Sequence, residues 1–87
     1  MENKNSICEK LILFISKKFE LNLDTFDKKS SLFFDGLLDS FEHFTLMHEI
    51  EGLYNIRISE HEMESNRLDT IENISEFIMH KRAALNE

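Results

Sequence analysis

Apolar residues return every three or four positions in three separate stretches of the chain. This spacing places them along one stripe of a helix, so each stretch predicts a helix with one buried face. The stretches cover residues 7–19, 40–55 and 70–82. The expected buried positions are Ile7, Leu11, Phe14, Ile15 and Phe19 in the first, Leu46, Met47, Ile50, Leu53 and Tyr54 in the second, and Ile71, Ile74, Phe77 and Ile78 in the third.

Helix starts are indicated by a capping side chain followed three positions later by Glu. The two side chains of such a pair satisfy backbone N–H groups that the first helical turn leaves unpaired. One pair opens a short polar segment at 60–64, and the others precede or overlap the apolar stretches. The pairs are Ser6 with Glu9, Asp39 with Glu42, Ser59 with Glu62, and Asp69 with Glu72. We therefore expect four helices, the third of them short.

The composition agrees with an all-α fold. The chain has neither Pro, which breaks helices, nor Val, which favours strands. Its 87 residues make one small domain, 1–87, too short for a deep enclosed active site with a supporting shell. We therefore expect no enzyme and no catalytic residues.

The connection between the first two expected helices is long, at about 20 residues, which is unusual in a compact domain unless the loop is ordered or functional. Its second half, 31–38, is rich in large apolar side chains, which are unfavourable in water. These side chains are Leu32, Phe33, Phe34, Leu37 and Leu38. We expect the loop to fold back over one end of the bundle and to hold the following residues in place.

The charge is −7 and is unevenly distributed. Residues 1–38 carry six bases and six acids, whereas 39–87 carry four bases and eleven acids. Such a surface repels nucleic acid and anionic membranes and suits basic protein surfaces, although many cytosolic proteins are equally acidic. No apolar stretch is long enough to span a membrane, and the lone Cys8 has no internal disulfide partner. We expect a cytoplasmic monomer in which Cys8 packs as a small apolar residue.

Ser40 is the main candidate for a functional residue, because it directly follows an acid in the segment Gly-Leu-Leu-Asp-Ser-Phe at 36–41. A Ser at a helix start is commonly a cap. Asp39 can take that role instead, which leaves Ser40 in the first turn, where N–H groups and the helix dipole stabilise an attached phosphate. Ser40 does not lie in the Gly-x-Ser-x-Gly motif of hydrolase nucleophiles.

A second feature of the helix at 40–55 is the face opposite its core stripe. At 100° per residue, Phe41, Phe44, His48 and Gly52 fall together there. Exposed apolar residues beside a reactive group often mark a partner surface. We therefore expect Phe41, Phe44, Thr45 and His48 to bind partners, the alternative being that the apolar loop covers the phenylalanines.

The histidines do not indicate a metal site. His48 and Glu49 begin like the zinc motif His-Glu-x-x-His, but position 52 is Gly. His43 and His48 lie about 140° apart around the helix, and His43 is expected on the core side in a structural role. His61 lies in a run of acids that is typical of a solvated surface.

The segment 31–58 resembles the acyl carrier and peptidyl carrier proteins, which are small acidic four-helix bundles. In that family an Asp-Ser pair at the start of the second helix carries 4′-phosphopantetheine on the serine. The motif GLLDSF is most similar to the D-alanyl carrier proteins and related stand-alone carriers. The residues that follow, Phe-Glu-His-Phe-Thr, differ from those carriers, and Leu68 stands where they often have Trp. A carrier from another biosynthetic pathway therefore stays open.

The resemblance implies attachment of 4′-phosphopantetheine to Ser40 by a phosphopantetheinyl transferase, with Asp39 helping to orient that enzyme. It further implies an adenylate-forming acyl or aminoacyl ligase that loads the thiol of the arm, and a downstream acyltransferase or synthase that takes the cargo. The alternative is a helical interaction module without a prosthetic group, in which Phe41, Phe44 and the acidic second half bind one fixed partner.

Overall fold

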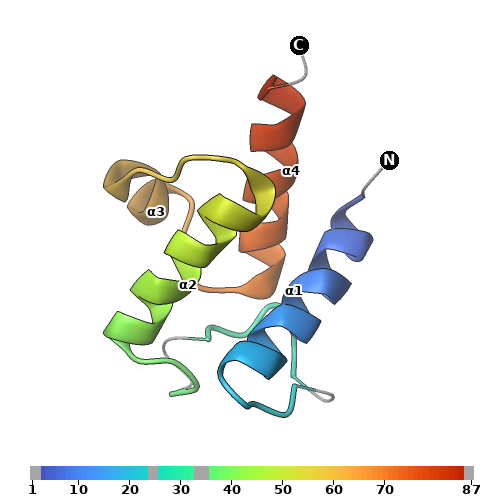
Figure 1. The fold of residues 1–87 in the computed structure, drawn as a ribbon, viewed down its shortest axis with the longest axis vertical. Helices are drawn as coiled ribbons and strands as arrows, with labels where there is room; N and C mark the ends of the chain where they lie inside the picture. The colour runs from blue at the N-terminus through green and yellow to red at the C-terminus, as the bar shows by residue number, and fades with distance from the viewer. Residues whose placement is uncertain (1–2, 24–25, 33–35, 86–87) are drawn as a thin grey trace.

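The computed structural model of the protein describes residues 3–23, 26–32 and 36–85. This part of the chain forms four helices and no strand, so the predicted all-α class is confirmed (Figure 1). The helices are α1 (Lys4–Lys18), α2 (Ser40–Tyr54), α3 (Glu60–Ser65) and α4 (Ile71–Leu85).

The core lies where α1, α2 and α4 meet. Figure 1 shows α1 beside α4, while α2 crosses in front and α3 lies at the side of the bundle. Each long helix contributes an apolar stripe that water does not reach, namely Ile7, Leu11 and Ile15 from α1, Leu46, Met47 and Ile50 from α2, and Ile71, Ile74, Phe77 and Ile78 from α4. Burial of these stripes is the main force that holds the helices together.

Cys8 packs inside the core, as predicted, and also makes a polar contact there. Its thiol donates to the buried Ser75 hydroxyl at 3.1 Å, and that hydroxyl donates to the Ile71 carbonyl at 2.8 Å. The two polar side chains are therefore satisfied within the α1–α4 contact.

Two of the four predicted helix caps are confirmed and two are wrong. Asp39 with Glu42 and Ser59 with Glu62 form reciprocal capping boxes at the starts of α2 and α3. In contrast, Asn3 caps α1 by accepting from Ser6 N–H at 2.8 Å. The helix thus begins three residues earlier than predicted, because an Asn side chain caps as well as Ser does.

The fourth cap is displaced by one residue. The Thr70 hydroxyl, rather than Asp69, accepts from Asn73 N–H at 3.0 Å. Glu72, the predicted partner of Asp69, instead accepts from Lys4 Nζ at 3.2 Å and ties α4 to α1.

Leu53 is the main error in the predicted core. It is 54% exposed and lies at the edge of an open groove that the last turn of α2 forms with α1 and α4. Phe14, Phe19 and Tyr54, which were also expected inside, are half-buried and pack against the core. The C-terminal end of α2 is therefore less tightly packed than its middle.

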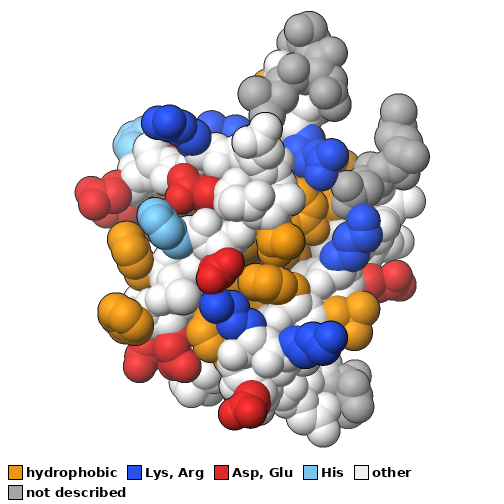
Figure 2. Space-filling model, viewed as in Figure 1, with side chains coloured by type: hydrophobic (Ala, Val, Ile, Leu, Met, Phe, Trp, Pro, Cys, Tyr) orange, Lys and Arg blue, Asp and Glu red, His pale blue; other side chains and the backbone are white. Residues whose placement is uncertain are grey.

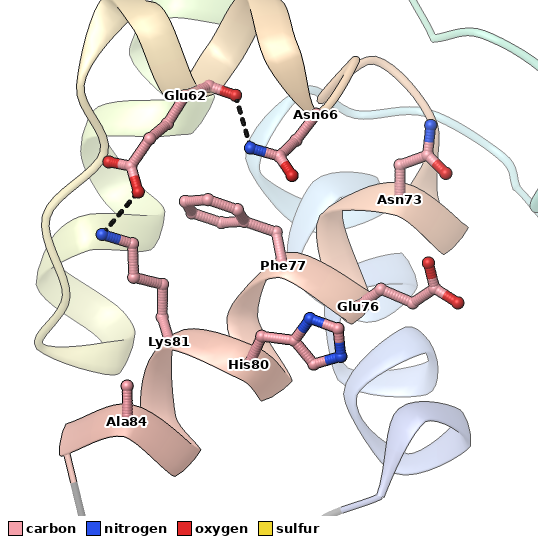
Figure 3. A pocket seen from close by; sticks show the side chains of 8 residues that line it. All are labelled: Glu62, Asn66, Asn73, Glu76, Phe77, His80, Lys81 and Ala84. Atoms are coloured by element: carbon pink, nitrogen blue, oxygen red, sulfur yellow. Dashed lines mark hydrogen bonds and ion pairs between the residues drawn. The ribbon is translucent and has the colours of Figure 1, made fainter.

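No residue of the short helix α3 is fully buried, but Met63 packs partly buried against the core and polar contacts also hold the helix. Lys81 Nζ of α4 lies 2.6 Å from the Glu62 carboxylate and 5.6 Å from the centre of the Phe77 ring (Figure 3). The Asn66 amide donates to the Glu62 carbonyl at 2.9 Å and closes the end of α3. Lys81 therefore joins α3 to the surface of α4.

Replacing Glu62 with Gln tests this ion pair through its pH dependence. The hydrogen bond from Lys81, helped by the backbone of Ser59, lowers the pKa of Glu62 from its usual 4.5. A lowered pKa stabilises the fold above about pH 4.5, and this contribution is lost as the pH falls through the lowered value. Glu62→Gln keeps the capping geometry and should be less stable at pH 7 by under ~1 kcal/mol.

The measurement is thermal unfolding from pH 7 to pH 3 for both proteins. The difference in unfolding free energy should shrink below about pH 4.5. In a Lys81→Gln background the difference at pH 7 should be smaller, whereas an unchanged difference would mean that Lys81 is not the cause.

Candidate functional site

At the start of α2, Asp39 caps the helix and the neighbouring Ser40 does not. Asp39 adopts extended backbone angles and its carboxylate accepts from Glu42 N–H at 2.8 Å, while Glu42 accepts from Asp39 N–H at 3.1 Å. Ser40 is the first residue of the helix and is exposed. Within the part of the chain that the structure describes, no hydrogen bond engages the Ser40 hydroxyl. The prediction that Asp39 caps the helix in place of Ser40 is confirmed.

The loop before α2 is anchored at two buried leucines. Leu32 and Leu38 have 0% and 2% of their surface exposed, and Leu38 N–H donates to the Leu32 carbonyl at 3.0 Å. Leu37 is half-buried beside them, and Phe33 and Phe34 lie outside the described residues. Gly36 has φ of 80°, a left-handed conformation that glycine adopts without strain. The residues directly before the site are therefore held at Leu38, whose N–H bonds to Leu32.

The same loop is joined to the segment before α4. Leu32 N–H donates to the Asp69 carbonyl at 2.7 Å, and Ser31 forms an isolated bridge with Thr70. From the other side, His43 of α2 places Nε2 at 2.6 Å from the Leu68 carbonyl, which requires that nitrogen to be the donor. Contacts between residues that are far apart in the sequence thus hold the first turn of α2. The predicted structural role of His43 is confirmed.

The face of α2 beside Ser40 is aromatic and exposed. Phe41 is 77% and Phe44 is 56% exposed, so the alternative in which the loop covers them is wrong. The rings of Phe44 and His48 are stacked with centroids 5.9 Å apart. Thr45 donates to the Phe41 carbonyl at 3.0 Å.

These side chains form one surface with a shallow cavity of about 340 Å³, lined by Phe41, Phe44, Thr45, His48 and Glu49. We call this surface the aromatic face. In Figure 2 hydrophobic side chains and a histidine lie along the outer edge of α2, on the side away from α1 and α4. The structure therefore brings together all four side chains that were predicted to bind partners.

The acids of α2 near the aromatic face are engaged within the protein. Glu42 belongs to the capping box, and Glu49 accepts from Lys18 Nζ at 2.9 Å. Glu51 accepts from Ile58 N–H at 2.8 Å and lies 3.3 Å from His48 Nδ1. The aromatic face therefore presents aromatic rings and a histidine to a partner, and its nearby carboxylates already have contacts within the protein.

The site fits a covalent phosphate ester. Glu42 N–H is used by Asp39, whereas the N–H groups of Ser40 and Phe41 occupy the positions at a helix start that lack intrahelical partners. These groups and the helix dipole favour a phosphate on the Ser40 oxygen, and the exposed position leaves room for a long substituent.

Other kinds of site find less support in the described residues. No group of three His, Cys, Asp or Glu side chains lies close enough there to hold a metal ion. His61 is exposed on α3 and lies 3.4 Å from the Ser65 hydroxyl. In the same part of the chain, no helix has the length and apolar character needed to cross a bilayer.

Comparisons of the sequence with known protein families and with curated proteins give no match.

Proposed function

We propose that this protein is an acyl or aminoacyl carrier that bears 4′-phosphopantetheine on Ser40. The single observation that supports this best is the separation of roles at the start of α2. Asp39 caps the helix, and Ser40 is left exposed with its hydroxyl available. A serine that was only structural would be expected to make the capping bond itself.

The attachment requires one bond to form and one to break. The Ser40 oxygen attacks the phosphorus that bears the pantetheine group in coenzyme A, and the pyrophosphate bond breaks. Adenosine 3′,5′-bisphosphate leaves, and the serine proton passes to a base of the transferase. A phosphodiester on Ser40 would be at the start of α2, where the positive end of the helix dipole would stabilise its negative charge.

The attached arm supplies a thiol that carries the cargo as a thioester. The chain itself contributes the attachment point, a fixed approach to it and the aromatic face on which partner enzymes dock. The proposed partners are a phosphopantetheinyl transferase, an adenylate-forming acyl or aminoacyl ligase, and a downstream acyltransferase or synthase. Because one surface serves several enzymes in turn, each contact should be small and short-lived. We place this cycle in the cytoplasm and expect the carrier to act as a monomer.

The second candidate is a helical interaction module without a prosthetic group. It is favoured by the exposure of Phe41 and Phe44, because an aromatic patch also suits a permanent partner. This candidate gives Ser40 no chemical role. The two proposals therefore differ in whether Ser40 is covalently modified, which can be measured.

The test is the intact mass of the protein after incubation with coenzyme A, Mg²⁺ and a broad-specificity phosphopantetheinyl transferase. Wild type should gain the mass of one phosphopantetheinyl group, and Ser40→Ala should gain none. Ser59→Ala is the matched control, because Ser59 is also an exposed serine at a helix start but makes the capping bond. It should be modified as wild type is. No gain in wild type would support the interaction module instead.

A further inference from the structure

Exposed residues of α2 form a row that starts at Ser40. Ser40, Phe44, His48 and Gly52 follow one another at intervals of four, and residues spaced in this way lie along one ridge of a helix. We call them the α2 row. The rings of Phe44 and His48 are stacked, and both line the shallow cavity of the aromatic face. The proposed attachment point therefore lies at one end of a strip of surface that is covered by rings.

Gly52 continues this strip as bare backbone. A glycine in the interior of a helix costs stability relative to alanine, because it loses more backbone freedom on folding. Gly52 lies within the regular helix α2, and a Cβ atom added to it would meet no atom within 4 Å. Neither its backbone angles nor its packing therefore require a glycine. Another use of glycine is to let a ligand approach the backbone closely, and Gly52 leaves this end of the row open to such an approach.

The chemistry of the α2 row matches the middle of the phosphopantetheine arm. Between its phosphate and its thiol, the arm is uncharged and carries a pair of methyl groups and two amide groups. Phe44 offers an apolar ring, and the acids beside the row, Glu49 and Glu51, are engaged within the protein. His48 Nδ1 lies 3.3 Å from the Glu51 carboxylate, so in the neutral ring Nδ1 is the donor and Nε2 is left as an acceptor for an amide N–H.

The arm is long enough to follow the row. At 1.5 Å per residue, α2 advances by about 12 Å from Ser40 to His48 and by about 18 Å from Ser40 to Gly52. Beyond its phosphate the arm has about as many bonds as four peptide residues, so it extends over roughly 14 Å. With the phosphate on Ser40, the amides of the arm reach His48 and the thiol reaches beyond it towards Gly52.

We propose that the arm, once attached to Ser40, lies along the α2 row in the free carrier. Its methyl groups pack on the Phe44 ring, an amide N–H donates to His48 Nε2, and the thiol lies towards Gly52. This arrangement rests on the proposed function, because it requires Ser40 to carry the arm. An enzyme that docks on the aromatic face covers the same rings and displaces the arm from them. Docking of a partner and release of the arm are therefore coupled.

The experiment compares the apo and the phosphopantetheinylated protein, labelled with ¹³C and ¹⁵N, by NMR. Intact mass first shows that the arm is attached. Nuclear Overhauser effects should then join the methyl protons of the unlabelled arm to the ring protons of Phe44. The amide shifts of His48 and Gly52 should also change, whereas a phosphate alone would affect only the first turn of α2.

Phe44→Ala should abolish the contacts of the arm methyl groups and reduce the shift changes at His48 and Gly52 at least twofold. Leu13→Ala is the matched control, because it removes an exposed apolar side chain from α1 instead of α2. It should leave both readouts as in wild type. Melting curves check that both variants fold, and intact mass checks that both carry the arm.

A mass gain in wild type without Overhauser effects to Phe44 would overturn this proposal and leave the carrier function standing. Effects that join the arm to the core residues Leu46 or Met47 would also overturn it, because they would place the arm inside the bundle. So would effects that arise only between a labelled and an unlabelled molecule, because the arm would then lie on a second copy of the chain. No mass gain in wild type would overturn this proposal and the carrier function together.

Discussion

Leu46→Ala should lower the free energy of unfolding by about 3 kcal/mol, since it removes a fully buried side chain and leaves a cavity. Leu46 lies in the middle of α2, in the stripe that packs on α1 and α4. A domain of this size has a total stability of the order of 5 to 10 kcal/mol, so this loss is a large part of it. Urea unfolding followed by circular dichroism measures the change.

Leu53→Ala is the matched control, because it removes the same atoms from the same helix. Leu53 is 54% exposed, so its replacement should cost less than about 1 kcal/mol. Losses of similar size at the two positions would mean that the last turn of α2 is packed as the sequence pattern suggested. A small loss at both would place the core elsewhere.

Phe41→Ala should slow the phosphopantetheinylation of Ser40 by about tenfold in kcat/KM while leaving the stability nearly unchanged. Phe41 directly follows the attachment residue and is 77% exposed, so an enzyme that reaches Ser40 must also cover this ring. Burial of an aromatic anchor at the centre of an interface is worth about 1 to 2 kcal/mol, which corresponds to this change in rate. Initial rates at low protein concentration measure the effect.

Leu13→Ala provides the comparison, since Leu13 is exposed to a similar extent, at 70%, but lies on α1. It should be modified at the wild-type rate. An equal loss of rate in both variants would show that the effect is not specific to the aromatic face. A large loss of stability in Phe41→Ala would mean that the ring supports the fold instead.

The start of α2 was predictable from local sequence. The capping box of Asp39 and Glu42 is a short-range signal, and the helical repeat placed Phe41 and Phe44 on the face away from the core. The start of α4 was harder, because Asp69 and Thr70 are both able to cap. In the structure Thr70 caps the helix. The preceding Asp69 is held by a distant segment, because its carbonyl accepts from Leu32 N–H.

Features that depend on how the helices are placed were not predictable. Leu53 has the same periodicity as its buried neighbours, but in the structure it lies at the edge of the groove between α2, α1 and α4 and is exposed. The bond from His43 to the Leu68 carbonyl joins residues 25 positions apart. The sequence indicated that His43 faces inward, but its partner depends on the path of the loop after α3.

The most direct measurement of the central proposal is the location of the modification by tandem mass spectrometry. After incubation with coenzyme A and the transferase, protease digestion should yield one modified peptide, the peptide that contains Ser40. Fragmentation should place the phosphopantetheinyl group on that residue. A modification on Ser59 or another side chain, or no modified peptide, would contradict the proposal that Ser40 is the attachment point of a carrier.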